Sequence, residues 1–337
     1  LTIQSKETIK EEKVKFGHEI EKMKPHPKAE FETFKNGFKY ILLPNKTPEK
    51  RVMVYLYVSS GSLNETDKQQ GLAHYLEHMA FNGTKNFPGE TIIDFFKKIG
   101  MSFGGDTNAH TSFDETVYKL NLPDSSHKED AIKIIADYAM NMLITAEEVE
   151  KERGIILSEK RARDTIDSRI WKHNIEFLLP DNLIPKRMPI GIDETINNAK
   201  REDLLEYYNN WYRPENMVLI VVGDIETKPW HKLIEKAFKN FKAKSAPVKG
   251  YSLSEVTHKG LKINYYFEKE ATETNIGINT VSVKKAQPLN FKEKTKIQIT
   301  ENAAIHILNE RLREKVNQKN SPFTGAIFRT YTWLEEV

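Results

Sequence analysis

Short apolar and alternating segments in the first part of the chain predict β-strands at residues 31–35, 38–43, 52–59, 107–112 and 115–122. Asn36-Gly37 separates the first two segments, and this dipeptide is typical of a two-residue hairpin turn. A further strand is predicted at 217–223, where the residues are apolar almost throughout. Hairpin connections of this kind indicate a largely antiparallel sheet.

Apolar residues at helical spacing predict several helices among these strands. They are expected around 71–83, from Thr91 through Lys98, after Pro123-Asp124, from about Ala146 to past Arg163, and at 230–241. Hairpins mixed with paired helices favour the α+β class, with helices packed on one largely antiparallel sheet.

The length of 337 residues is enough for two domains. Residues 1–30, rich in Lys and Glu near the start, are interpreted as an N-terminal extension, and 31–242 as the first α+β domain. Residues 243–260 are rich in Lys, Ser, Pro and Gly, which is typical of a linker. Strands predicted at 261–268 and 274–282 and a helix at 291–317 repeat the strand-then-helix order, so 261–337 is interpreted as the truncated start of a second, homologous domain.

Composition narrows the possible partners and the possible chemistry. The net charge is +3, from 51 basic and 48 acidic residues, so the chain has no basic excess that would favour nucleic acid. The strongly apolar run at 217–222 is too short to span a bilayer. The absence of cysteine excludes disulfides, thiolate metal ligands and a cysteine nucleophile, so any zinc site must use His and carboxylates. The chain begins at Leu1 rather than Met, and we expect that an upstream segment was removed.

The most specific motif is His74-x-x-Glu77-His78, which lies in the helix predicted around 71–83. Histidines four residues apart share one helix face, where two imidazoles can hold one Zn²⁺ at about 2.0–2.1 Å. Glu77 lies beside one of them and is suited to take a proton from a water at the metal. The motif inverts the His-Glu-x-x-His zinc helix. The alternative is an ordinary solvated helix face, but the flanking residues are mostly apolar.

A third ligand is needed, and Glu152 and Glu159 are the candidates. They are seven residues apart, so on a helix they lie within about 20° of the same face. One can bind the metal while the other orients a ligand or the water. The alternative is a charged, solvated helix, since other glutamates are close by.

In combination, these motifs resemble the insulysin/pitrilysin metallopeptidases, which include the mitochondrial processing peptidases. The sequence has His-x-x-Glu-His followed by Glu-x₆-Glu, and the last His and the last Glu are 81 positions apart. Three further segments agree with that family: 108–118, Pro189-Ile190-Gly191 and 211–217. The resemblance covers about residues 31–337 and is closest to the bacterial periplasmic branch of large zinc proteases.

The resemblance implies that 31–242 is a zinc-binding peptidase domain and that the second copy is incomplete. It implies that His74, His78 and Glu159 bind one Zn²⁺ per chain, with Glu77 as general base and Glu152 as a supporting acid. Asn108 and Ala109 would contact the backbone of an extended peptide at a sheet edge. The chain would then be a soluble, periplasmic or otherwise exported zinc endopeptidase acting on unfolded peptides or small proteins.

The family also has a late Arg and Tyr that stabilise the oxyanion. Arg329 and Tyr331 do not have the required spacing, so we expect a missing C-terminal half or a partner subunit to supply these groups. Two alternatives remain: a non-catalytic homologue that serves as a peptide-binding or structural subunit, and a zinc hydrolase of a non-peptide substrate. The intact His74, Glu77, His78 and Glu159 argue against the first.

Overall fold

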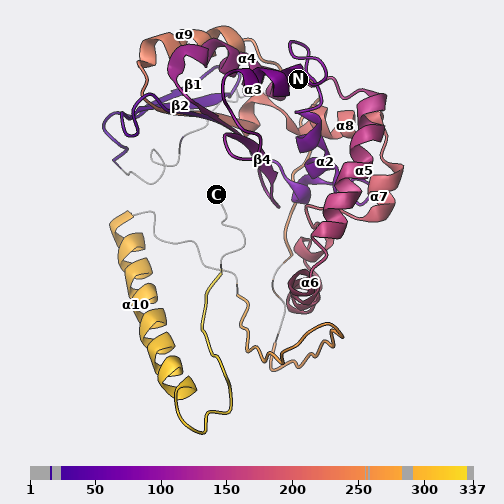
Figure 1. The fold of residues 1–337 in the computed structure, drawn as a ribbon, viewed down its shortest axis with the longest axis vertical. Helices are drawn as coiled ribbons and strands as arrows, with labels where there is room; N and C mark the ends of the chain where they lie inside the picture. Colours follow the sequence, from indigo (N-terminus) through magenta and orange to yellow (C-terminus); the bar gives the residue numbers. More distant parts are fainter. Residues whose placement is uncertain (1–15, 17–23, 255, 257–258, 283–290, 332–337) are drawn as a thin grey trace, which may run out of the picture. The chain divides into compact units, whose positions relative to one another are not determined.

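The computed structural model describes residues 16, 24–254, 256, 259–282 and 291–331 (Figure 1). The chain divides into two compact units, 28–282 and a second one formed by 1–27 with 283–337. Most of the predicted N-terminal extension therefore lies outside the described residues. None of the described helices is both long enough and apolar enough to cross a membrane.

The described part of the first unit contains one six-stranded sheet in the order β1-β2-β6-β3-β5-β4. Its strands are β1 (Glu30–Thr33), β2 (Lys39–Pro44), β3 (Val52–Val58), β4 (Thr107–Thr111), β5 (Thr116–Leu122) and β6 (Met217–Gly223). Only β2 and β6 pair in parallel, and the other neighbours are antiparallel. The strands predicted between residues 31 and 223 and the α+β class are confirmed. Gly37, with a φ of 89°, supplies the left-handed position of the β1–β2 hairpin.

Helices lie in the segments that connect the strands of the sheet. In the first unit they are α2 (Leu72–Met79), α3 (Thr91–Lys98), α4 (Lys128–Met140), α5 (Ala146–Ala162), α6 (Ile166–Leu178), α7 (Asp193–Asn198), α8 (Arg201–Trp211) and α9 (Thr227–Phe238), with short 3₁₀ turns at Ser62–Asn64, Ser125–His127, Ile184–Lys186 and Pro214–Asn216. The second unit contains α10 (Phe291–Val316), which confirms the helix predicted at 291–317.

The predictions of strands at 261–268 and 274–282 are wrong. Residues 261–282 are described and form no strand. The pattern that predicted the first strand is real, because Leu261, Ile263 and Tyr265 alternate with polar residues, yet all three side chains are exposed. A strand needs a neighbouring strand to complete its hydrogen bonds, and these residues have none among the described segments.

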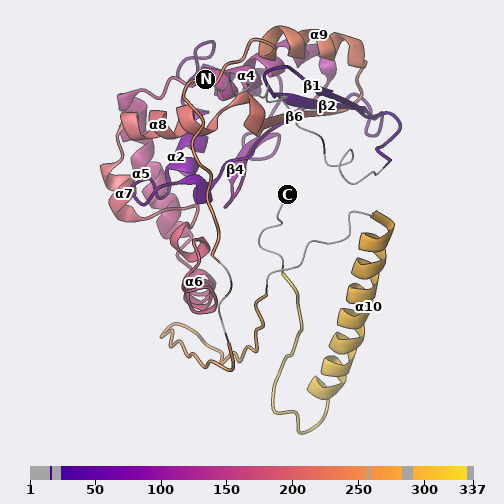
Figure 2. The same ribbon diagram turned by 180° about the vertical axis from the view of Figure 1, so that it is seen from behind.

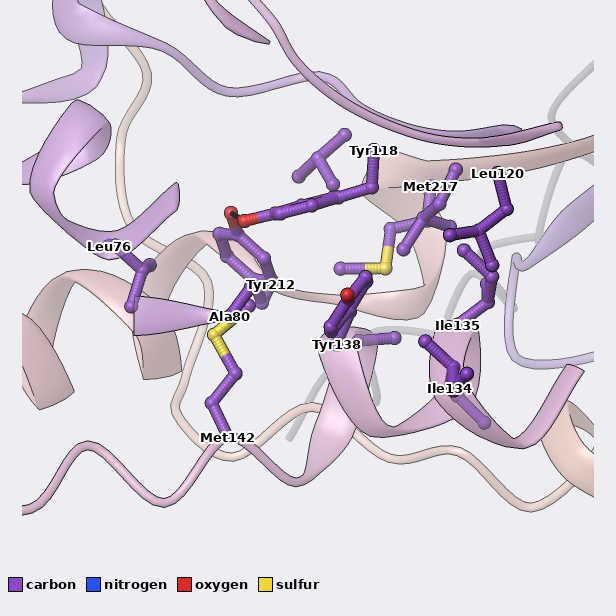
Figure 3. Packing of buried hydrophobic residues seen from close by; sticks show 14 of the residues in the cluster. Leu76, Ala80, Tyr118, Leu120, Ile134, Ile135, Tyr138, Met142, Tyr212 and Met217 are labelled. Carbon is purple, nitrogen blue, oxygen red and sulfur yellow. Dashed lines mark hydrogen bonds between the residues drawn. The ribbon is translucent and has the colours of Figure 1, made fainter. Parts of the chain in front are cut away.

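One face of the sheet carries the core. Along β3, Val52, Val54, Leu56 and Val58 are buried, and the residues between them are more exposed. Both views show α4 and α9 over one face of the sheet, with α2, α5, α7 and α8 gathered at the β4 end (Figures 1 and 2). In the core, Tyr118 of β5 and Tyr212 point toward one another, and their hydroxyls are 2.6 Å apart (Figure 3).

A buried carboxylate holds the beginning of α2. Glu65 accepts hydrogen bonds from the backbone N–H groups of Gly71 (3.0 Å) and Ala73 (2.8 Å). These are among the N–H groups that a helix leaves without intrahelical partners. Burial raises the pKa of Glu65 to about 8, although both hydrogen bonds and Arg187 oppose the shift. Glu65 therefore fixes the first turn of the helix that carries the His-x-x-Glu-His motif.

The same turn is pressed against a second loop. Gly71 precedes α2 with a φ of 99°, and Gly191 has a φ of 70°. A Cβ on Gly191 would lie 2.4 Å from the Cα of Gly71, so only glycine allows this approach. The Pro189-Ile190-Gly191 motif thus has a structural reason, because it lets the loop contact the start of α2.

Candidate metal centre

Helix α2 brings three polar side chains of the motif into a largely buried setting. His74 and Glu77 are buried, and His78 is half-buried. The helix packs against α5, α8 and β4. Tyr75 ties it to α5 by donating a hydrogen bond from its hydroxyl to the carbonyl of Val149. The motif is therefore part of the core rather than a solvated helix face.

Three ligand atoms converge between α2 and α5. The Nε2 atoms of His74 and His78 are 3.2 Å apart. One Glu159 oxygen, Oε2, lies 3.3 Å from the Nε2 of His78 and 3.7 Å from that of His74. All three atoms fall within 4.8 Å of one another. Arg163 contacts the other Glu159 oxygen, Oε1.

These distances fit one metal ion. With bonds of about 2.0–2.1 Å and tetrahedral angles, the ligand atoms around Zn²⁺ lie about 3.3 Å apart. The three separations are close to that value, and two imidazoles with one carboxylate form a ligand set found in catalytic zinc sites. The residues present therefore fit the metal that the sequence motif predicts.

Glu152 contacts the side of the His78 ring opposite to Glu159. Its Oε1 is 2.7 Å from His78 Nδ1, and its Oε2 accepts a 2.6 Å hydrogen bond from Asn82. Although burial alone would raise it, the hydrogen bonds from His78 and Asn82 lower the pKa of Glu152 overall. An ionised carboxylate only accepts hydrogen bonds, so Nδ1 of His78 carries the proton, and its Nε2 lone pair faces His74 and Glu159.

The two histidines differ in their electrostatics. Burial lowers the pKa of His74 to about 3, and the nearby charges of His78 and Arg163 add to the effect. His74 is therefore neutral at pH 7, which is the form that binds metals. Its Nδ1 is buried without a hydrogen-bond partner among the described residues. For His78, burial lowers the pKa, but Glu152, Glu77 and Glu159 together outweigh burial, and the pKa is raised.

Glu77 is placed on the β4 side of the helix. Burial raises the pKa of its carboxyl group, while a hydrogen bond from Thr111 opposes the shift. The hydroxyl of Thr111 on β4 donates to Glu77 Oε2 at 2.7 Å. Glu77 is thus held beside the converging ligand atoms rather than among them.

Asn108 and Ala109 lie on β4, the last strand of the sheet. Asn121 donates to the carbonyl of Asp106 at one end of the β4–β5 ladder, and Ser112 donates to the carbonyl of Glu115 at the other. Hydrogen-bonded pairs alternate along an antiparallel ladder, so the main-chain groups of Ala109 and Thr111 point to the open edge. The N–H of Ala109 donates to the Asn108 side chain at 2.9 Å.

Two contacts of the site were not predicted from the sequence. Thr111 lies within the predicted strand segment, but its contact with Glu77 joins residues 34 positions apart. Asn82 follows His78 by four residues, and that spacing is the only signal that could have indicated it. His110 does not join the ligand group, because its Nε2 lies 3.2 Å from Glu115. Arg329 and Tyr331 belong to the other compact unit.

Two models of known protein families match this chain. Residues 40–178 match the model for Insulinase (Peptidase family M16), and 198–331 match the Peptidase M16 inactive domain. The candidate metal centre lies entirely within the first match. The chain belongs to the insulinase family of zinc metallopeptidases, which confirms the resemblance seen in the sequence.

Individual relatives agree with this family assignment. The probable zinc protease PqqL of Escherichia coli is 32% identical over 287 residues, covering 83% of this chain and 30% of the relative. The chloroplastic stromal processing peptidase of Pisum sativum is 34% identical over 209 residues, which is 60% of this chain and 16% of that protein. The crystal structure of the first half of the periplasmic protease PqqL from E. coli matches with a TM-score of 0.64 and 34% identity, over 68% of this chain and 50% of that one. The chain thus spans about a third or less of these curated relatives.

Proposed function

We propose that this chain carries the active site of a zinc-dependent endopeptidase, with His74, His78 and Glu159 holding one Zn²⁺. The observation that carries the proposal is the convergence of two Nε2 atoms and one carboxylate oxygen, 3.2, 3.3 and 3.7 Å apart, beside a buried glutamate. Zinc, when bound in such a site, lowers the pKa of a water to about 7 and polarises a carbonyl.

Glu77 acts as the general base in this proposal. Its burial raises its pKa, which brings a carboxylate closer to the operating pH and makes it a better proton acceptor. Thr111 occupies only one of its two oxygens. Glu152 keeps the His78 ring in the tautomer whose Nε2 is available to the metal.

The substrate is proposed to be an extended peptide that adds to the open edge of β4. The outward main-chain groups of Ala109 and Thr111 would pair with it, and the Asn108 side chain would have to release the N–H of Ala109. Main-chain pairing recognises any extended chain and depends little on side chains. Unfolded peptides and small unfolded proteins are therefore the proposed substrate class.

We further propose that full activity needs a second half or a partner subunit that supplies oxyanion donors. The loss of a single such donor costs on the order of 10²–10³ in rate. The curated relatives are much longer than this chain, which supports the idea. The periplasmic E. coli relative supports a proposed exported location.

The test is Glu77→Gln in the full-length protein, assayed with a quenched unstructured peptide. The variant keeps the shape of the side chain but removes the proton acceptor, so we expect hydrolysis to fall by about 10²-fold or more. Zinc content should remain at one ion per chain. A variant that keeps wild-type turnover would show that Glu77 is not the base. Wild-type protein that binds zinc but cleaves no peptide would favour the non-catalytic, peptide-binding alternative.

A further inference from the structure

Thr111 occupies a position that links two parts of the proposed active site. Its side chain donates to Glu77 Oε2 at 2.7 Å, and its main chain points to the open edge of β4. We propose that Thr111 is a positioning residue that orients Glu77 and couples it to the bound peptide. This inference rests on the proposed peptidase function.

The hydroxyl is well suited to hold a carboxylate. Glu77 is buried, and a buried carboxylate is stabilised by a donor in a fixed place. A β-branched side chain is stiff at χ1, so the position of the Thr111 hydroxyl follows the strand backbone. The orientation of the base is therefore tied to the position of β4, rather than to α2 alone.

This arrangement connects substrate binding with proton transfer. A peptide that pairs with the outward groups of Thr111 fixes the backbone from which its hydroxyl extends. Loss of the hydroxyl removes the donor to Glu77 but leaves those main-chain groups in place. The effect should therefore appear in kcat and leave KM nearly unchanged.

The chain offers a matched control on the same strand. Thr107 is four residues away on β4, so its side chain points to the same face as that of Thr111. Its hydroxyl is buried and has no hydrogen-bond partner among the described residues. Thr107→Val removes the same hydroxyl in the same strand without touching Glu77.

The experiment compares Thr111→Val, Thr111→Ser, Thr111→Ala and Thr107→Val in the full-length, zinc-loaded protein. We measure kcat and KM on an unstructured peptide, together with zinc content, zinc affinity and thermal unfolding. We expect Thr111→Val to lower kcat about 10-fold or more, since a hydrogen bond to a charged group is lost. Zinc affinity and KM should change by less than about threefold. Thr111→Ser should restore most of kcat, and Thr107→Val should match the wild type.

Wild-type kcat in Thr111→Val would overturn the inference and leave the peptidase function intact, and so would an effect of that substitution confined to an increase in KM. If Thr111→Val does not fold, the Ser and Ala variants decide, because they differ only in the hydroxyl. Equal kcat in those two would also overturn it. If the wild type itself cleaves no peptide although it binds zinc, the proposed function has failed and the role of Thr111 fails with it.

Discussion

The sheet has a histidine–carboxylate cluster near each of its two edges, and only one of them fits a metal. Near β1, His231 of α9 contacts Tyr40 through Nδ1 at 2.8 Å and Glu30 through Nε2 at 2.5 Å. Near β4, His74 and His78 direct their Nε2 atoms at each other and at Glu159. The first cluster has a protein partner for each ring nitrogen, whereas the second leaves its Nε2 atoms facing one another.

This difference shows what distinguishes a structural histidine from a candidate ligand. Two Nε2 lone pairs 3.2 Å apart repel, so a proton or a cation has to lie between them. The pKa of His74 is lowered to about 3, so at neutral pH its ring carries a single proton, and with that proton on Nδ1 the Nε2 lone pair is available to a cation. In the β1 cluster the hydrogen bonds already satisfy the ring. Proximity of one His to one Glu is therefore a weaker signal of a metal site than the convergence of two Nε2 atoms on one carboxylate oxygen.

The largest effect that could break this comparison concerns metal affinity. We expect His74→Ala to weaken zinc binding by more than about 100-fold, because losing a ligand should cost more than losing a residue that only orients one. His231→Ala should bind zinc as the wild type does. Competition with a chromophoric chelator at neutral pH measures both. Equal loss of zinc in the two variants would mean that the clusters do not differ in the way described.

A smaller effect concerns the group that orients a ligand. Glu152→Gln replaces the acceptor of His78 Nδ1 with an amide, and we expect zinc affinity to fall by about 10–100-fold. Glu150→Gln is the matched control on the same helix, because Glu150 is exposed and pairs with Arg153. Unchanged affinity in Glu152→Gln would remove Glu152 from the site. Weaker affinity in Glu150→Gln would indicate a general effect of charge on α5.

A third comparison concerns how stability depends on pH at two carboxylates, Glu65 at the start of α2 and Glu30 beside His231. Burial raises the pKa of Glu65 to about 8, so between about pH 4.5 and 8 the folded protein holds one more proton than the unfolded chain. The stability that Glu65 contributes is therefore present at low pH and lost as pH rises, by about 1.4 kcal/mol per pH unit. Chemical unfolding of the metal-free wild type and of Glu65→Gln at several pH values measures this effect. The difference in unfolding free energy between the two proteins should shrink as pH rises.

Glu30 on β1 gives a pH dependence of stability with the opposite sign. Its hydrogen bond with His231 lowers its pKa, so any stability it contributes is lost as pH falls below the ordinary glutamate range. Glu30 is partly exposed, and solvent screening keeps this contribution small. For Glu65 itself, the contradicting result would be a difference in unfolding free energy between wild type and Glu65→Gln that grows with pH, because its buried environment predicts a difference that shrinks.

Local patterns predicted most of the fold, and the failures have a common cause. Strand β5 follows from alternation, whereas β3 and β6 follow from short runs that are apolar almost throughout, and the structure buries alternate residues of both. Helix α6 was not predicted, although Trp171, Ile175 and Leu178 recur at helical spacing, and only Ile175 of its residues is buried. The segment 261–282 shows the converse, since its alternation is strong but no described strand pairs with it. Local sequence reports the tendency of a segment, whereas its pairing depends on distant residues.

The site follows the same rule. The spacing of His74, Glu77 and His78 on one helix is a local signal, and so is the seven-residue spacing of Glu152 and Glu159. Residue spacing alone left open which glutamate faces the metal. The contacts supply the distinction, because Glu159 approaches both Nε2 atoms and Glu152 approaches Nδ1. The contribution of Thr111 depends on β4 lying beside α2, which no local pattern encodes.

The place of β6 in the sheet has a consequence for how the chain is made. β6 lies between β2 and β3, and it pairs in parallel with β2 from about 180 positions further along the chain. During synthesis the β1–β2 hairpin cannot join β3, β5 and β4 until residue 223 has left the ribosome. Pairing over such a separation slows folding and leaves strand edges exposed meanwhile. All the proposed zinc ligands are thus translated before the strand that completes their supporting sheet.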